Sequence, residues 1–409
     1  MKNLVMLNNI LGKRRKNAEA LSIMGKSQLK PENWFQRNPK KTLVMVVLAL
    51  LVLVAFGTER LLGFLNHRRG IVLEAETERR YIKLREPRPR RQMRLRFPKN
   101  YLPYTDNAFT KTYKVDIDEN GFIEPSRKYA DPDLSIVFLG GSTTECMFME
   151  ERNRFPYLVG VLLEKETGKR INSYNGGFSG NNSLHAIDLL VNKVIPLEPR
   201  VVVFMENIND LSTLLYRKTY WNENNVRAPI ETLVKRKLLG KMLKELLIPN
   251  LNEAWRNFTT TVWGHEDDEF AQAHKQKVTV DRTAMAREFA MNLQMFVDIC
   301  RDRGIIPVLM TQGNRITEKP DPVVAAYIGQ YSKDTGISYQ DFKAAYDLFN
   351  DTIRQVGQKN GVLVIDLARQ VPPDKEHLYD LVHFNDAGSK LAAQLIAAQL
   401  KPLIVSSEQ

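Results

Sequence analysis

The stretch LSIVFLGGS, residues 134–142, is a short apolar run that leads into two glycines and a serine. Such a run is typical of a buried strand followed by a tight turn. Four more short apolar runs follow along the chain, and segments with helical spacing of apolar residues separate them. The runs occupy residues 170–174, 201–205, 305–310 and 362–365, and the helical segments occupy 155–167, 183–194, 283–303, 339–359 and 387–400. Strands that alternate with helices predict an α/β fold with a mostly parallel five-stranded sheet covered on both faces.

Polar segments stand at the predicted ends of these strands. They read GGS at residues 140–142, GFSG at 177–180, NIND at 207–210 and DLVH at 380–383. In open parallel sheets, ligands bind beyond the carboxyl ends of the strands. Together the segments supply a nucleophile, a base with an orienting carboxylate, and donors for an oxyanion. This is the set that acyl transfer through a serine ester needs.

Ser142 is the predicted nucleophile, because a serine on a strand-to-helix turn exposes its hydroxyl beside a helix N-terminus that favours negative charge. There is a structural alternative. Residues 142–145 read STTE and match a capping box, in which Ser142 would only cap its helix. Position 144 is Thr, so the G-x-S-x-G elbow of ordinary α/β-hydrolases is absent.

Asp380 and His383 stand three residues apart, a spacing that brings two side chains to one face of a turn. The carboxylate can then hold the imidazole tautomer while the other ring nitrogen deprotonates Ser142. The predicted oxyanion donors are the backbone N–H groups of Ser142 and Gly180 and the side-chain amide of Asn209. Taken singly, Gly180 also suits a tight turn, and Asn209 also suits an Asx turn or a helix cap.

In this order the four segments resemble the blocks of the SGNH (GDSL-like) hydrolase superfamily, which begin with Ser, Gly, Asn and His. The matching blocks are FLGGSTTE, the segment that closes at Gly180, the segment around Asn209, and DLVHFN. The resemblance covers about residues 131–405 and implies a flavodoxin-like three-layer α/β/α domain that hydrolyses or transfers acyl esters. The lead-in TYKVDIDENGF resembles that of a membrane-anchored subgroup.

Two positions depart from the family pattern. Gly-Asp-Ser is Gly-Gly-Ser here, which resembles polysaccharide-linked members, and Asn207 stands where the third block usually has glycine. A side chain at position 207 would narrow the acyl pocket or add a donor, so the substrate preference of generic esterases is not carried over. Glu206, Gln312 and Arg315, at strand ends, are further candidates for substrate contact, with a structural role as the alternative for each.

Composition argues against several other functions. The only two cysteines, Cys146 and Cys300, have no His partners nearby, so no metal site is predicted, and no cofactor is expected. Residues 1–98 hold 22 Lys/Arg and 7 Asp/Glu, whereas the remainder holds 37 and 40, so the net charge of +12 belongs to the N-terminal quarter. Because the predicted folded part lacks a basic surface interleaved with aromatics, nucleic acid is not an expected partner.

Residues 42–57, TLVMVVLALLVLVAFG, carry no charge and predict a single membrane-spanning helix. Sixteen residues cover about 24 Å of a hydrocarbon core of about 30 Å, and an extension to residue 65 would complete the span. A buried core helix is the alternative, but the segment has no amphipathic face; a cleaved signal peptide would need an A-x-A site, which is absent. Five Lys/Arg at 24–41 against three at 58–77 place the N-terminus in the cytoplasm and the catalytic domain outside.

The sequence thus predicts a basic cytoplasmic tail (1–41), an anchor (42–57), a juxtamembrane connector with a small β-hairpin (58–130) and a catalytic domain (131–409) with an insertion at about 211–281. The expected function is that of a membrane-anchored serine esterase that removes acyl groups, acetyl first among them, from carbohydrate or another ester. An O-acyltransferase of surface polysaccharide, a lipid-active esterase and a non-catalytic glycan- or partner-binding scaffold stay open as alternatives. The oligomeric state stays undetermined.

Overall fold

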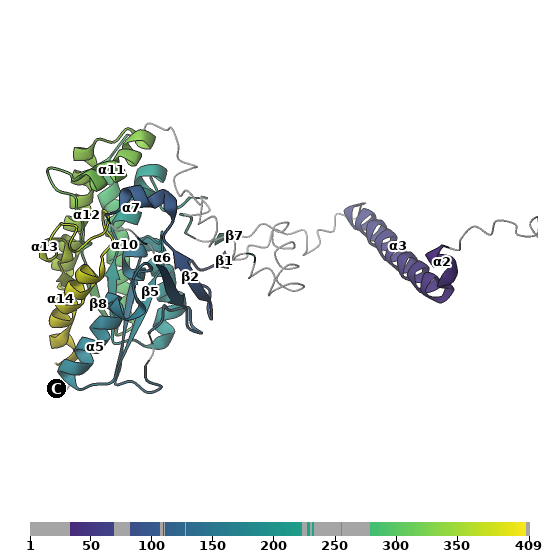
Figure 1. Cartoon of the computed structure of the whole chain (residues 1–409), viewed down its shortest axis with the longest axis horizontal. Coiled ribbons are helices and arrows are strands. Elements are labelled where there is room, and N and C mark those ends of the chain that lie inside the picture. The colour runs from purple at the N-terminus through teal and green to yellow at the C-terminus, as the bar shows by residue number, and fades with distance from the viewer. Residues whose placement is uncertain are drawn as a thin grey trace, which may run out of the picture. The chain divides into compact units, whose positions relative to one another are not determined.

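The computed structural model describes residues 33–68, 82–106, 109, 111–126, 128–222, 227–229, 231–232, 255 and 279–405. The chain divides into two compact units, residues 1–79 and residues 80–409. Figure 1 shows the helices of the first unit in purple and the α/β unit in blue to yellow.

The first unit contains the short helix α2 (Trp34–Arg37) and the long helix α3 (Pro39–Arg68). Pro39 suits the first position of α3 because the N–H that proline lacks would have no partner there. Within α3, Pro39–Thr58 is long and apolar enough to cross a membrane by length and composition. The predicted basic tail lies mostly outside the described residues.

The second unit is built on one five-stranded sheet, in the order β5-β4-β6-β8-β9, with every pairing parallel. Its strands are β4 (Leu134–Gly140), β5 (Ile171–Gly177), β6 (Val201–Met205), β8 (Ile306–Met310) and β9 (Leu363–Ile365). In chain order this is the 2-1-3-4-5 arrangement of flavodoxin-like folds. From β4 the chain continues to β5 on one side of the sheet and then to β6 on the other side. The carboxyl ends of β4 and β6 therefore flank the topological switch point, where such sheets bind ligands.

Alternate residues of each strand face two separate apolar cores. On one face Val137, Leu139 and Phe204 pack with α6 (Ser183–Leu189), α7 (Ile208–Arg217), α10 (Arg282–Asp302), α11 (Pro322–Thr335) and α12 (Tyr339–Asn360). On the other face Ile136, Phe138 and Val203 pack with α5 (Phe155–Thr167) and α14 (Asp386–Val405). In Figure 1, α14 is yellow and lies beside α5. The predicted three-layer α/β/α fold is therefore confirmed.

The segment before β4 packs against the sheet. Strand β2 (Gln92–Arg96) pairs antiparallel with β3 (Thr112–Asp116), and β1 (Ile82–Lys83) pairs with β7 (Glu231–Thr232). The expected turn at residues 118–121 forms, with the Asn120 and Phe122 N–H groups donating to Asp118 at 2.9 and 2.8 Å. Residue Ile123 then bridges to Asn175 of β5. The compact unit begins near residue 80, and the start of the catalytic domain at residue 131 stays a prediction.

The remaining short elements connect these parts. They are η1 (Lys99–Tyr104), α4 (Ser142–Glu145), η2 (Glu151–Asn153), η3 (Leu190–Val194), η4 (Ile195–Leu197) and α13 (Leu367–Gln370). The first part of the predicted insertion is α7, an ordinary helix after β6. Most of the insertion lies outside the described residues, so its proposed place over the pocket stays a prediction.

Candidate active site

Ser142, His383 and Asp380 form a continuous hydrogen-bonded row at the carboxyl edge of the sheet. Ser142 follows β4 after one residue, Gly141, and its Oγ lies 2.8 Å from Nε2 of His383. The other ring nitrogen, Nδ1, lies 2.8 Å from Oδ2 of Asp380. The sheet and the segment after β9 thus bring together residues 241 positions apart, in the order nucleophile, base and orienting carboxylate.

The turn that carries the histidine is held by local hydrogen bonds. The backbone N–H groups of Val382 and His383 donate to Asp380 Oδ1 at 2.9 and 2.8 Å. The ring of Tyr379 stacks on the imidazole at a centroid distance of 5.5 Å and an interplanar angle of 9°. These contacts leave the imidazole one orientation, with Nε2 directed at the serine.

Two carboxyl groups determine the charge state of the imidazole. Burial alone would lower the pKa of His383, but the charge and hydrogen bond of Asp380, together with the charge of Glu145, raise this pKa above its ordinary value. The result is a base that holds a proton more strongly than a free histidine. This suits a group that must carry the Ser142 proton through a reaction.

Ser142 does not cap its helix. The N-cap of α4 is Gly141, with no side-chain cap bond, and the Ser142 hydroxyl faces His383. Glu145, the supposed partner in the capping box, is buried and accepts a hydrogen bond from the Ser179 hydroxyl. Burial raises the pKa of Glu145 to about 7, against the opposing effects of Ser179, Arg154 and His383. The capping box that the sequence allowed is therefore not formed.

Asn209 and Gly180 lie on the same rim of the sheet. The Asn209 amide donates to the carbonyl of Asn181 at 2.7 Å, and a Cβ placed on Gly141 would lie 2.2 Å from the same nitrogen. Glycine at position 141 therefore leaves room for the Asn209 amide beside the serine. Since a carboxamide has two N–H donors, one remains after the bond to Asn181.

Gly180 adopts φ +79°, a conformation that favours glycine, and its carbonyl accepts from Arg227 Nη1 at 2.6 Å. In the part of the chain that the structure describes, neither the Gly180 N–H nor the Ser142 N–H donates to a protein acceptor. Both donors are thus available to a bound group.

Three residues that the sequence analysis did not select hold the Gly180 loop in place. Besides Arg227, Arg85 donates from Nε to Asn181 Oδ1 at 3.2 Å, which ties the segment before the sheet to the loop. Asp210 accepts from the Ser183 N–H at 3.0 Å and from the Tyr220 hydroxyl at 2.6 Å. Asp210 stood in the NIND motif, whereas Arg85 could not be told apart from the many basic residues of the connector.

Glu206 and Asn207 are buried at the end of β6, away from solvent. Both carboxylate oxygens of Glu206 are without a hydrogen-bond partner among the described residues. Burial and then the charge of Asp210 raise the pKa of Glu206 well above its ordinary value, which favours the neutral form of the group. The Asn207 amide donates to the carbonyl of Tyr346 on α12 at 3.2 Å. Both side chains therefore lie in the protein interior and are not presented to a substrate.

Gln312 ties three elements together behind the serine. Its Oε1 accepts from Ile208 N–H at 3.1 Å and from the Tyr346 hydroxyl at 2.7 Å, and its Nε2 donates to Thr143 Oγ1 at 2.9 Å. With all these bonds made inside the protein, Gln312 positions α4 and α7 and is not presented to solvent.

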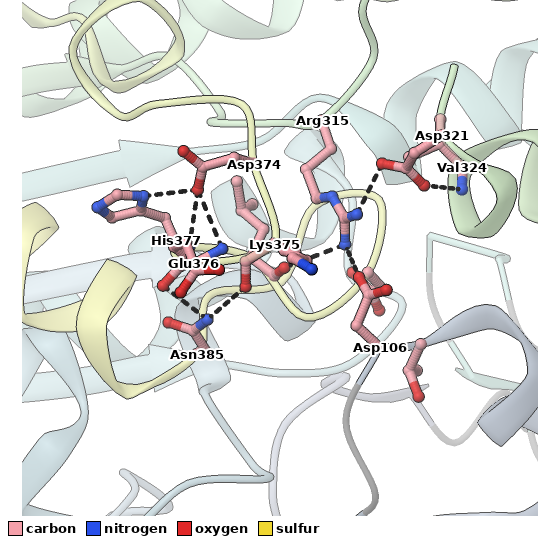
Figure 2. Close-up of polar contacts among 12 residues, drawn as sticks. Asp106, Arg315, Asp321, Val324, Asp374, Lys375, Glu376, His377 and Asn385 are labelled. Carbon is pink, nitrogen blue, oxygen red and sulfur yellow. Dashed lines mark hydrogen bonds and ion pairs between the residues drawn. The ribbon is translucent and has the colours of Figure 1, made fainter.

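Arg315 is an ion-pair centre (Figure 2). It binds Asp106, in the segment between β2 and β3, and it binds Asp321, the N-cap of α11, at 2.6 Å. Its side chain is 3% exposed. The contacts fix Arg315 as a link between the N-terminal segment and the domain, in keeping with the structural alternative.

Cys146, which follows α4, is buried, and burial raises the pKa of its thiol to about 12. It is therefore an inert thiol and not a second nucleophile. Across the residues that the structure describes, no group of three His, Cys, Asp or Glu side chains is arranged to hold a metal ion.

Comparisons with known proteins identify a matching family and several similar solved structures. Residues 138–391 match the model of the GDSL-like Lipase/Acylhydrolase family. Similar solved structures include a lipase/acylhydrolase from Enterococcus faecalis, at 16% identity, with 66% of this chain and 96% of that chain covered and a TM-score of 0.39. Another is Axe2, an acetylxylan esterase from Geobacillus stearothermophilus, at 15% identity, with 66% and 94% covered and a TM-score of 0.38.

A third similar structure is LAE5, an alpha/beta hydrolase from the metagenome of Lake Arreo, at 16% identity, with 65% and 94% covered and a TM-score of 0.39. The search of curated proteins found no match.

Proposed function

The chain belongs to the GDSL-like lipase/acylhydrolase family and is an SGNH-type ester hydrolase, and from this premise we propose that Ser142 is its nucleophile, His383 its base and Asp380 the group that orients His383. The observation that carries the proposal is the row of contacts from Ser142 Oγ through the imidazole to Asp380, at 2.8 Å each. A serine hydroxyl needs such an adjacent base to become a nucleophile near neutral pH.

The reaction would run in two halves. His383 Nε2 takes the Ser142 proton as Oγ attacks the ester carbonyl, and the oxyanion binds the N–H groups of Ser142 and Gly180 and the Asn209 amide. The imidazolium then gives its proton to the leaving alcohol, which produces an acyl-serine. In the second half His383 takes a proton from an incoming water or hydroxyl while that oxygen attacks the acyl carbonyl. The imidazolium then returns the proton to Ser142 Oγ as the acyl–serine bond breaks.

The test uses the full-length chain in detergent and a small aryl acetate. Wild type should release the aryl alcohol and label with a fluorophosphonate, whereas Ser142→Ala should do neither. Ser332→Ala, on α11, is the matched control, because among the residues described in the structure the Ser332 hydroxyl donates only to the carbonyl of Ile328. Equal turnover by wild type and Ser142→Ala would remove Ser142 from the mechanism, and labelling independent of His383 would favour the scaffold alternative.

We further propose that the substrate is a carbohydrate that carries small acyl esters, with acetyl as the first candidate. We also propose that α3 anchors the enzyme in a membrane with the catalytic unit outside. The anchor rests on the uncharged run in α3, and the orientation on the excess of Lys/Arg before it. A reporter enzyme fused after Val405 would be active only on the outer side. Activity on the cytoplasmic side would reverse the orientation.

An O-acyltransferase shares the first half-reaction and differs only in the acceptor. With the acyl-enzyme formed from aryl acetate, a rate of acetyl transfer to an oligosaccharide that exceeds hydrolysis would favour the transferase. Hydrolysis that is unaffected by the oligosaccharide would favour the esterase.

A further inference from the structure

A cleft with a volume of about 360 Å³ opens beside the candidate active site, and none of the proposed steps uses it. This volume lies within the usual range of about 300–1,000 Å³ for small-molecule sites. Its lining includes the aromatic residues Phe109, Tyr113, Phe148 and Tyr379. Tyr379 is also the residue whose ring stacks on His383, so a single ring separates the cleft from the proposed base.

The aromatic side chains form an interlocked wall. Phe109 packs edge-on against Tyr379 at a centroid distance of 4.9 Å, and Phe148 packs against Tyr113 at 6.0 Å. Behind them Phe97 stacks on Phe109 at 4.1 Å and contacts Phe148 at 4.7 Å. Tyr113 and Tyr379 are buried, whereas Phe109 and Phe148 are partly exposed, so these two rings are the ones that can contact a ligand. Because their neighbours already hold them, a ligand that stacks on them costs the protein little ordering.

The wall combines two parts of the chain. Phe97, Phe109 and Tyr113 come from the segment of β2 and β3, ahead of residues 138–391, which match the family model. Phe148 and Tyr379 come from within that match. The cleft is therefore a feature that the added N-terminal segment of this chain makes with the hydrolase domain.

The polar rim indicates which ligand fits. Lys111 is paired with Glu150 at 2.7 Å and lies over the Tyr113 ring, so its charge is already compensated. Asp386 is exposed and makes no hydrogen bond or ion pair within the described part of the chain. Only Ala387 among the lining residues is aliphatic, which is unlike an acyl-chain tunnel. Aromatic faces with an unpaired acceptor at the rim suit a polyhydroxylated ring without negative charge.

We propose that this cleft binds a neutral pyranose ring of the glycan that carries the ester, with the C–H face of the sugar on the aromatic wall and its hydroxyls at Asp386. Aromatic ring faces are partially negative and attract the polarised C–H bonds of a pyranose. The inference rests on the proposed function, because it places the esterified sugar next to Ser142.

The test measures binding without turnover. The full-length Ser142→Ala chain in detergent is titrated calorimetrically with a partially O-acetylated xylo-oligosaccharide. Adding Phe148→Ala should raise Kd about three- to tenfold. Asp386→Ala, at an exposed position, should also raise Kd. Tyr157→Ala, on α5 and outside the cleft, should leave Kd at the value of the parent.

Three results would overturn the inference. The first is an unchanged Kd in both cleft variants, or no binding at all. The second is tighter binding of an O-acetylated oligogalacturonide of equal length, which would mean an anionic ligand. The third is tighter binding of a dodecanoyl ester that Phe148→Ala abolishes, which would mean an acyl chain. If the glycan binds as expected but turnover of aryl acetate by the wild type does not depend on Ser142, the proposed function is wrong and the inference about the cleft still holds.

Discussion

Two Asp-x-x-His turns follow one another in this chain, at residues 374–377 and 380–383, and each orients its imidazole through the Asp. In the first turn Oδ1 of Asp374 holds both the backbone and the ring contacts, whereas in the second Oδ1 of Asp380 holds the backbone and Oδ2 holds the ring. In both, His Nδ1 lies 2.8 Å from a carboxylate oxygen of the Asp three residues earlier. In both, two backbone N–H groups donate to one oxygen of that Asp, at 3.0 and 3.1 Å in the first turn and 2.9 and 2.8 Å in the second. The spacing alone thus produces an oriented imidazole twice.

The surroundings separate the two turns. The side chain of Asp374 is 46% exposed and that of Asp380 is 8% exposed. His377 makes its only side-chain hydrogen bond among the described residues to Asp374, whereas His383 also reaches Ser142. The Asp-x-x-His spacing is enough to orient an imidazole. The imidazole can activate a serine only where the fold places it next to one, at the carboxyl edge of the sheet.

The first turn is instead packed against the start of α14 (Figure 2). Asn385 donates from its amide to the carbonyls of Lys375 and Glu376 at 3.0 and 2.9 Å. The carbonyl of His377 lies so close to Gly388 that a Cβ there would come within 2.0 Å of the oxygen. The first turn thus fixes the helix that follows the second.

The largest expected effect is on the two histidines. His383→Ala should lower kcat for a small aryl acetate by about 10⁵–10⁶-fold, because it removes the proposed base. His377→Ala should stay within twofold of wild type per folded molecule. Comparable losses in both variants would mean that the two turns are not functionally distinct.

The two aspartates should differ next. Asp380→Asn should lower kcat by about 10⁴-fold, because an amide does not hold the imidazole in the required tautomer. Asp374→Asn should leave kcat near wild type, since its partner His377 does not contact Ser142. Steady-state rates with aryl acetate decide this, and near-normal activity of Asp380→Asn would contradict its assigned role.

Asn209→Ala should lower kcat by about 10²–10³-fold, the usual loss for one oxyanion donor. Of the two turns, only the second contacts Ser142, whose oxyanion the Asn209 amide would bind. The variant therefore tests the site that the second turn serves and leaves the first turn unaffected. A higher KM with kcat unchanged would mean that the Asn209 amide binds the substrate in the ground state and not the oxyanion.

The structural role of the first turn can be tested at Gly388. Gly388→Ala should lower the free energy of unfolding by about 1–3 kcal/mol, because the methyl group meets the His377 carbonyl. Gly329→Ala is the matched control on a helix, since nothing lies within 4 Å of the position that its methyl group would take. Denaturant unfolding that ranks Gly329→Ala as the more damaging change would contradict the packing argument.

The smallest expected effect is on the pH profile. Since His383 must be neutral to act as a base and its pKa is raised, kcat/KM should rise with pH through a midpoint above 6.5. Asp380→Asn removes a charge that favours the imidazolium, so the midpoint should fall. Glu145→Gln should shift it less in the same direction, and Asp374→Asn should not move it. A midpoint that rises in Asp380→Asn would reverse the electrostatic assignment.

Much of the fold could be predicted because its signals are local. Apolar runs such as 134–140 and 201–205 lie close in sequence to the helices that cover them. The pattern of apolar residues in a segment follows from which of its residues are buried, so strands and helices can be recognised from that pattern. The segment before residue 131 was harder, because its strands are short and their pairing partners are far apart. The helix α11 was not predicted at all.

For the candidate site, residue type and spacing were enough to select Ser142, Asp380, His383, Gly180 and Asn209, and the structure brings these residues to one rim. The same reasoning also gave Glu206, Asn207, Gln312 and Arg315, which follow strands as well, as candidates for substrate contact. Those four side chains point into the interior or into ion pairs, and burial of this kind depends on helices that arrive from elsewhere in the chain.

By itself the sequence determined the α/β layering, the strand ends that carry polar groups, and the oriented Asp–His pairs, because all three follow from the backbone and from neighbours a few residues away. Only the tertiary structure decided which Asp–His pair meets a serine, and that strands β2 and β3 build an aromatic cleft beside it. The reason is physical: hydrogen bonds and ring contacts act over a few ångströms, and residues more than 200 positions apart come that close only through the packing of the whole sheet.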